Sequence, residues 1–236
     1  MDDRWYEIAT LDHPWIVRRF EVLRRFGGAL IATASAIAEF GCGHGLLQRQ
    51  IEDSFDASVA GFDLNTAALA QSVSRYSPRT CYNVLERRAE YKAAFDLILL
   101  ADVLEHIEDE AAFLRAIGSH LAPGGSVIIN VPALQPLYSG YDRAVGHVRR
   151  YCTASLARVA QRSGMAVASY TYWGLPLIPL LVLRKFWDRS QPGEQIASGF
   201  QTGSAWRDRA LLYISRCELV PQRLIGSSLM AVLKPR

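Results

Sequence analysis

The sequence has few cysteines, and none is placed as metal or redox sites require. Its four cysteines lie far apart, and no two form a Cys-x-x-Cys pair. This spacing argues against a zinc site and against a disulfide framework. We therefore expect no bound metal.

Long apolar runs and long basic runs are also missing. The longest apolar stretch, residues 173–183, contains two prolines and is too short to cross a bilayer. The acidic N-terminus lacks the apolar core of a secretory signal. The net charge is only +3, and Lys and Arg do not gather into one run, so nucleic acid is not indicated as a partner. These features favour a cytoplasmic location.

Half of the 236 residues are hydrophobic, which is enough for one sizeable core. Apolar runs that indicate strands alternate with amphipathic stretches that indicate helices. This alternation predicts a mostly parallel, doubly wound α/β sheet with helices on both faces. The predicted strands are residues 34–40, 58–62, 80–85, 95–100, 126–131, 165–172 and 229–233. The predicted helices between them are residues 46–54, 66–76, 108–120 and 153–163; Asn65 is expected to cap the second and Thr153 the last. Residues 123–125 are predicted to form a turn.

Two segments depart from this rhythm. Residues 5–26 carry aromatics and arginines at helical spacing, ended by Gly27 and Gly28, and predict an N-terminal helical cap within residues 1–30. Residues 174–226 are interrupted by prolines and contain a helical stretch near residues 207–218. We interpret them as an insertion, or lid, over the ligand edge of the sheet. The core then covers residues 35–172 and the last strand residues 227–236.

A glycine-rich turn follows the first predicted strand and precedes a helix. Gly41, Gly43 and Gly45 suit a turn that needs positive φ or close backbone approach. A dinucleotide fingerprint would place a further glycine where Leu46 stands. Glu39 would repel a pyrophosphate and suits a ligand that carries an ammonium group. The turn therefore argues against a dinucleotide.

Polar residues also follow the next predicted strands. Asp63 ends the second strand, where a carboxylate can accept the hydroxyls of a ribose. Asn83 lies at the weak third strand and could bind an adenine edge. Asp102 and His106 follow the strongest strand, at the edge where ligands bind. Each also has a structural alternative, as a helix cap, a strand end or a packing residue.

These motifs, in this order, resemble those of class I S-adenosylmethionine-dependent methyltransferases, most closely the group of the ubiquinone-biosynthesis O-methyltransferases. The resemblance covers about residues 35–172 and implies a seven-stranded Rossmann-like fold in a single domain, 1–236. The segments that carry it are residues 39–45, 61–65, 95–99, 102–107 and 121–125.

The resemblance implies that S-adenosylmethionine is the cofactor. The glycines would contact its methionine part, Asp63 its ribose, Leu64 and Asn83 its adenine, and Ala101 or Asp102 its sulfonium side. Asn83 departs from the family, in which this position is commonly acidic. The full expected set is Arg19, Glu39, Phe40, Gly41, Cys42, Gly43, Gly45, Asp63, Leu64, Asn83, Ala101, Asp102 and His106.

Arg19 belongs to this set through the leading helix. Related enzymes often place an N-terminal helix over the cofactor, where Arg19 could meet the carboxylate. The alternative is a solvated basic face beside Trp15 as an anchor.

The segment from Asn130 to Tyr151 follows the fifth strand and should lie beside the methyl donor. His147 is the candidate catalytic residue, as general base or orienting group for the acceptor. Arginines here could hold an anion in a bidentate fork. The alternative is a structural network in which Asp142 pairs with an arginine and orders the loop. The expected substrate-binding residues are Tyr138, Tyr141, Asp142, Arg149, Arg150, Tyr151 and Trp173.

The apolar segment 173–187 leaves three interpretations open: it lines an acceptor pocket, touches a membrane surface, or packs on the core. The main functional hypothesis is methyl transfer to an O, N or C atom of a small, partly apolar acceptor, in lipid, glycan or secondary metabolism. The alternatives are a non-catalytic S-adenosylmethionine-binding partner protein and a nucleotide-linked oxidoreductase. Nothing in the sequence indicates an oligomeric state.

Overall fold

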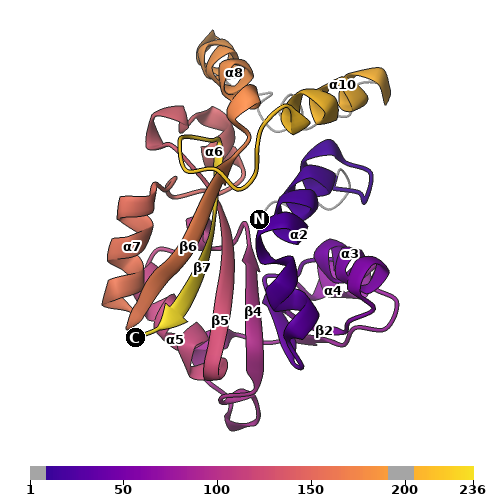
Figure 1. Cartoon of the computed structure of the whole chain (residues 1–236), viewed down its shortest axis with the longest axis vertical. Coiled ribbons are helices and arrows are strands. Elements are labelled where there is room, and N and C mark those ends of the chain that lie inside the picture. Colours follow the sequence, from indigo (N-terminus) through magenta and orange to yellow (C-terminus); the bar gives the residue numbers. More distant parts are fainter. Residues whose placement is uncertain (1–8, 191–204) are drawn as a thin grey trace.

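A computed structural model describes residues 9–190 and 205–236, and shows one seven-stranded sheet with helices on both faces (Figure 1). The strand order is β3-β2-β1-β4-β5-β7-β6, and β7 is antiparallel to both of its neighbours. The predicted Rossmann-like, mostly parallel fold is confirmed. The strands are β1 (Ile37–Phe40), β2 (Val59–Asp63), β3 (Arg79–Cys81), β4 (Phe95–Ala101), β5 (Leu121–Pro132), β6 (Met165–Trp173) and β7 (Ser228–Pro235).

The helices follow the strands in the predicted alternation. The longer ones are α2 (Pro14–Thr33), α3 (Leu46–Phe55), α5 (Glu110–His120), α7 (Thr153–Arg162), α8 (Ile178–Ser190) and α10 (Ala205–Arg216). Shorter turns are α4 (Thr66–Ala70), α6 (Gly140–Ala144), η1 (Val84–Glu86), η2 (Ala89–Tyr91), η3 (Leu104–His106), η4 (Gln135–Leu137) and η5 (Leu175–Leu177). No helix among the described residues is long and apolar enough to cross a membrane.

Successive residues of β4 point to opposite faces of the sheet and enter two hydrophobic cores. Ile98 and Leu100 belong to the core that includes α5 and α7 residues. Leu97 and Leu99 belong to the core that includes α2 and α3 residues. This explains why β4 is apolar almost throughout: both faces of a parallel sheet are covered.

The leading helix differs from its prediction because its glycines do not end it. α2 runs through Gly27 and Gly28 to Thr33. A Cβ on Gly27 would lie 2.6 Å from Ile128 Cδ1 on the sheet. The glycine therefore allows the helix to approach the sheet closely. The part of the predicted helix before Ala9 lies outside the described residues.

Other boundaries differ where polar side chains capture backbone groups. The helix predicted over 66–76 ends at Ala70, and Glu52 accepts the amide hydrogens of Arg75, Tyr76 and Ser77 beyond it. The strand predicted over 80–85 ends at Cys81, because the side chain of Asn83 caps η1 instead.

Three predictions about element ends, a turn and a helix cap are wrong, and one prediction about a helix cap is confirmed. The first strand begins only at Ile37. Residues 123–125, predicted as a turn, lie within the long strand β5, opposite a register shift between Phe95 and Leu97. The cap of α7 is Cys152 rather than Thr153. The predicted cap of α4 is confirmed, because the side chain of Asn65 accepts from the Ala68 amide.

Helices α8 and α10, in the segment between β6 and β7, lie beyond the carboxyl ends of the parallel strands (Figure 1). Helix α10 contacts α2, and Glu218 accepts a hydrogen bond from Arg18 at 3.2 Å. Glu218 also accepts from the amides of Gly174 and Leu175, at 2.7 and 3.0 Å. One buried carboxylate thus joins the start of this segment, its end and the leading helix.

Candidate cofactor and acceptor site

The glycine turn has the conformation expected from its sequence. Gly41, Gly43 and Gly45 have φ values of 79°, 54° and 79°. A Cβ on Gly41 would lie 2.5 Å from Val103 Cγ2, and one on Gly45 would lie 2.7 Å from Ser72 Oγ. Backbone conformation and lack of space both exclude larger residues here.

Asp63, at the end of β2, holds this turn. Its carboxylate accepts hydrogen bonds from the amide of Gly43 at 2.7 Å and from the amide of Asn65 at 2.8 Å. Each oxygen carries one of these bonds and keeps a further lone pair, because a carboxylate offers about four acceptor sites. The geometry leaves Asp63 able to accept further hydrogen bonds from a ligand.

Glu39 is a buried carboxyl group beside the turn. It is 3% exposed, and its Oε2 atom has no hydrogen-bond partner among the described residues. Burial raises the pKa of Glu39 to about 8, and the positive charge of Arg19 acts in the opposite direction. An ammonium group would satisfy both the free oxygen and the buried charge, so the site fits the amino group of S-adenosylmethionine.

A chain of hydrogen bonds links the leading helix to the ends of β4, β5 and β6. Arg19 Nη1 lies 2.7 Å from Asp102 Oδ2, and Asn130 Nδ2 donates to Asp102 Oδ1 at 2.6 Å. Trp173 Nε1 donates to Asn130 Oδ1 at 2.9 Å. Ala101, Arg19 and Asn130 line a small cavity between α2 and the sheet. The paired Asp102 and Arg19 thus mark the boundary of the cofactor region.

Three residues expected at the cofactor have other visible roles, and a fourth is exposed. Phe40 stacks on Phe62 in the core, with ring centroids 4.8 Å apart, so its side chain is engaged within the protein. Cys42 is buried and packs toward Gly61. The amide oxygen of Asn83 accepts from the Leu85 amide, which turns this side chain toward its own backbone. Leu64 is 65% exposed beside Asp63, where a ligand could cover it.

The loop between β5 and α7 is organised by one buried carboxylate. Asp142 is fully buried and accepts from Arg150 Nε at 2.9 Å. It also lies 2.8 Å from His147 Nδ1 and caps α6 through the amide of Ser139. The arginine and the histidine lower the pKa of Asp142 to about 2 although burial opposes them. The structural network considered for this loop is therefore present.

This network corrects most of the residues expected to contact a substrate. Arg149 pairs with Glu110 at 2.6 Å, and Arg150 bonds the Ala133 carbonyl as well as Asp142. The hydroxyl of Tyr151 donates to Glu110 at 2.7 Å, and its side chain is in the core. Because these groups are engaged within the protein, the two arginines do not form an anion-binding fork.

The remaining expected residues lie around the loop. Trp173 is completely buried, 4.5 Å from the ring of Trp15, so it packs in the core and does not line an open pocket. Tyr138 donates to the backbone carbonyl of His147 at 2.7 Å. The ring of Tyr141 lies 4.4 Å from the guanidinium of Arg184 on α8. This stacking fixes α8 against the loop.

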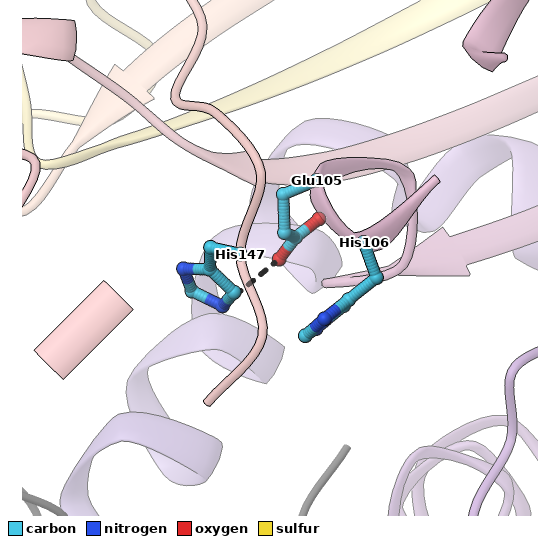
Figure 2. Close-up of side chains that lie close together, drawn as sticks. All are labelled: Glu105, His106 and His147. Carbon is cyan, nitrogen blue, oxygen red and sulfur yellow. Dashed lines mark ion pairs between the residues drawn. The ribbon is translucent and has the colours of Figure 1, made fainter. Parts of the chain in front are cut away.

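Three side chains meet where the loop crosses η3 (Figure 2). Glu105 Oε1 lies 3.9 Å from His147 Nε2, and the rings of His106 and His147 are 4.8 Å apart in an edge-to-face arrangement. Burial raises the pKa of Glu105 well above its usual range, and burial lowers the pKa of His106 to about 4. Sequence reasoning singled out both histidines but missed Glu105, although it directly precedes His106 at the carboxyl edge of β4.

This fold and this glycine turn define a class I S-adenosylmethionine-dependent methyltransferase. A family model described as "Methyltransferase domain" matches residues 17–170, and the chain belongs to that family. S-adenosylmethionine is its cofactor, and the buried Glu39 with its free oxygen fits that group.

Curated relatives include O- and N-methyltransferases. The chain is 27% identical over 140 residues to ubiquinone biosynthesis O-methyltransferase of Sodalis glossinidius, covering 54% of this chain and 53% of that protein. It is 29% identical over 117 residues to phosphoethanolamine N-methyltransferase 1 of Triticum aestivum, covering 47% of this chain and 24% of that protein. The chain thus spans between a quarter and about half of the length of these two relatives.

Solved structures share the fold. Phosphoethanolamine N-methyltransferase 2 of Haemonchus contortus, solved with S-adenosyl-L-methionine, superposes with a TM-score of 0.60 at 20% identity, covering 95% of this chain and 56% of that one. A SAM-dependent methyltransferase from Archaeoglobus fulgidus gives a TM-score of 0.57 at 14% identity, covering 93% and 94%. These likenesses concern the fold alone.

Proposed function

We propose that this chain transfers the methyl group of S-adenosylmethionine to an O, N or C atom of a small, partly apolar acceptor. The observation that carries the proposal is the position of residues 102–106. Val103 packs against Gly41 of the glycine turn. Two residues later, the carbonyl of Glu105 accepts from the amide of Val148 in the loop at 2.8 Å. One short segment therefore separates the donor turn from the loop assigned to the acceptor.

Methyl transfer requires little covalent catalysis by the protein. The sulfonium of the cofactor supplies an activated methyl group, so proximity and in-line orientation account for most of the decrease in the activation barrier. Glu39 would hold the ammonium group and Asp63 the ribose. The backbone amides of the glycine turn would lie against the methionine part of the cofactor. His147, anchored by Asp142, would act on the acceptor as proton acceptor or as orienting group.

The segment after β6 supports an acceptor with apolar character. Leu180, Leu183 and Phe186 on α8 are 51%, 67% and 62% exposed. Because Arg184 of the same helix stacks on Tyr141, these apolar side chains are held beside the loop. We propose that α8 and α10 form a lid whose apolar residues meet the acceptor.

The test replaces His147 with alanine. We expect methyl transfer to fall about 100-fold or more, as when a proton-transferring group is lost. Release of S-adenosylhomocysteine would be measured with a panel of phenols, amines and amino alcohols as acceptors, and cofactor affinity by calorimetry. Full activity of the variant would refute the role of His147. Cofactor binding without transfer to any acceptor would favour the non-catalytic alternative.

A further inference from the structure

We propose that Glu105, His106 and His147 bind a divalent transition-metal ion beside the methyl-donor edge. Each offers one ligand atom, and the three atoms lie within 4.8 Å of one another. Figure 2 shows that the Glu105 carboxylate and the His147 ring face each other, with the His106 ring beside them. Two come from η3 and one from the loop, so the site joins His147 to a residue 41 positions earlier in the chain.

The hydrogen bonds of the histidines leave the required lone pairs free. His147 Nδ1 lies 2.8 Å from Asp142 Oδ1, and an ionised carboxylate only accepts, so Nδ1 carries the proton. His106 Nδ1 lies 3.1 Å from the carbonyl oxygen of Gly146, which also only accepts. Both Nε2 atoms are then unprotonated, as a metal ligand requires.

Glu105 is a buried carboxyl group without a hydrogen-bond partner in the described part of the chain. The residue is completely buried, and neither carboxylate oxygen has a hydrogen-bond partner among the described residues. The separation of 3.9 Å from His147 is too long for a hydrogen bond. The buried Nε2 of His106 has no hydrogen-bond partner among the described residues either. A carboxylate buried without a partner is costly, and a bound cation removes that cost.

The neighbouring charges do not already supply this cation. Arg19 is engaged with Asp102 at 2.7 Å, and Arg150 with Asp142 and the Ala133 carbonyl. The charge of Asp102 also acts on Glu105, and the charges of Arg19 and Arg150 act on it in the opposite direction without donating a hydrogen bond to it. Asp142 accepts a hydrogen bond from His147 Nδ1, the ring nitrogen that would not bind the metal. A carboxylate is a common partner of that nitrogen in metal-binding histidines.

Two imidazoles and one carboxylate favour zinc, iron or cobalt over magnesium or calcium. Metal–ligand distances of about 2.0–2.2 Å would draw the three atoms inward by under about 1 Å. The His147 side chain is 13% exposed, so one side of the cluster remains open to a further ligand. On the proposed function, this ligand is an acceptor oxygen or nitrogen, which the ion would orient and whose proton it would acidify. With Nε2 on the ion, His147 would then orient the acceptor through the metal and would not accept its proton.

The experiment measures metal binding directly, without relying on activity. The full chain is treated with a chelator and titrated with Zn²⁺ by calorimetry and with Co²⁺ by visible absorption. We expect one ion per chain. Glu105→Gln and His147→Ala should each weaken binding about 100-fold or more, and Asp142→Asn about 10–100-fold. Glu108→Gln, which alters an exposed neighbouring carboxylate, and Cys81→Ser, which removes an exposed thiol, should bind as the parent does.

Absence of saturable binding in the parent chain would overturn the metal site, as would unchanged binding in Glu105→Gln. If His147→Ala unfolds, as judged by circular dichroism, Glu105→Gln decides, since it replaces a buried carboxyl with a neutral group of the same shape. Metal binding without any methyl transfer would keep the site and refute the proposed function. Methyl transfer with no metal binding would refute the site alone.

Discussion

Two buried glutamates show how the surroundings of one residue type decide its chemistry. Glu39 has an oxygen without a partner, and burial raises its pKa to about 8. Glu52 accepts from the Ser74 hydroxyl and from the amides of Arg75 and Ser77. These hydrogen bonds lower its pKa to about 2 against the effect of burial. The surroundings of Glu39 therefore suit a positively charged ligand, and those of Glu52 stabilise the folded chain.

Glu39→Gln should separate stability from cofactor binding. The folded parent keeps a proton on Glu39 that the unfolded chain releases above the ordinary pKa of 4.5. Its stability therefore falls as the pH rises from about 4.5 to about 8. The Gln variant lacks this loss and should be at least about 1 kcal/mol more stable at pH 8. Urea unfolding at several pH values measures this.

The same variant should bind S-adenosylmethionine more weakly. At pH 7 the ammonium group would draw the proton from Glu39, so binding to the parent should release about one proton. Calorimetry in buffers of different ionisation enthalpy counts this proton. No proton release by the parent, or equal affinity of the two proteins, would contradict the assigned role of Glu39.

Glu52→Gln is the matched control and should have the opposite sign. The folded pKa of about 2 lies below the ordinary value, so Glu52 stabilises the fold above pH 4.5 and this contribution is lost as the pH falls toward 2. The variant should lose about 1–3 kcal/mol at pH 7, the worth of hydrogen bonds to a charged group. Cofactor affinity should not change. A variant as stable as the parent at pH 7 would refute this account.

The sequence predicted a residue's role correctly where its type and position allow only one role, and incorrectly where they allow two. Positive φ at Gly41, Gly43 and Gly45 follows from their place between strand and helix. Gly27 was misread because a glycine in a helix can end it or allow close packing. Trp173 was misread for the same reason: its chemistry suits a ligand as well as a buried internal partner, and only the fold brings Asn130 to it. For Arg150 the sequence left both interpretations open, and the pairing with Asp142 is the one present.

At the scale of elements, the acceptor loop depends on a buried ion pair. Arg150→Met removes the cation beside Asp142, and both side chains of this pair are almost fully buried. Leaving a buried charge with one fewer partner should cost about 3–5 kcal/mol. The loop that carries His147 should loosen, so methyl transfer should fall more than cofactor affinity. Thermal unfolding and hydrogen exchange of residues 138–151 would measure this.

Arg149→Met is the matched control on the neighbouring position. Arg149 pairs with Glu110 closer to the surface, where its side chain is 27% exposed. Loss of such a pair should cost about 1 kcal/mol or less. Equal losses in the two variants would show that Asp142 does not organise the loop.

Element boundaries were less predictable than the elements themselves. Periodicity located all seven strands, but it could not show that Glu52 collects the amides after α4 or that Asn83 caps a 3₁₀ turn. The bonds of Glu52 join residues 23 to 25 positions apart, whereas the cap by Asn83 is a local bond to Leu85 that replaces the strand. The cluster of Glu105, His106 and His147 was hidden because His147 meets the other two residues only in the folded chain.

At the scale of the whole molecule, the sheet order gathers the candidate cofactor residues at one edge. The glycine turn follows β1, Asp63 ends β2 and Asp102 follows β4, so the cofactor residues meet at the carboxyl ends of neighbouring strands. The alternation of strands and helices predicted this from the sequence. The position of α8 and α10 beyond that edge follows from β7 returning antiparallel between β5 and β6 (Figure 1).

The central claim is that this edge binds S-adenosylmethionine. Calorimetric titration of the chain with S-adenosylmethionine, S-adenosylhomocysteine and NAD tests it most directly, with Asp63→Ala as the variant. We predict one molecule of either sulfur nucleoside per chain, no binding of NAD, and at least about tenfold weaker binding by the variant, because hydrogen bonds to a charged group are lost. Binding of NAD with none of S-adenosylmethionine would contradict the account.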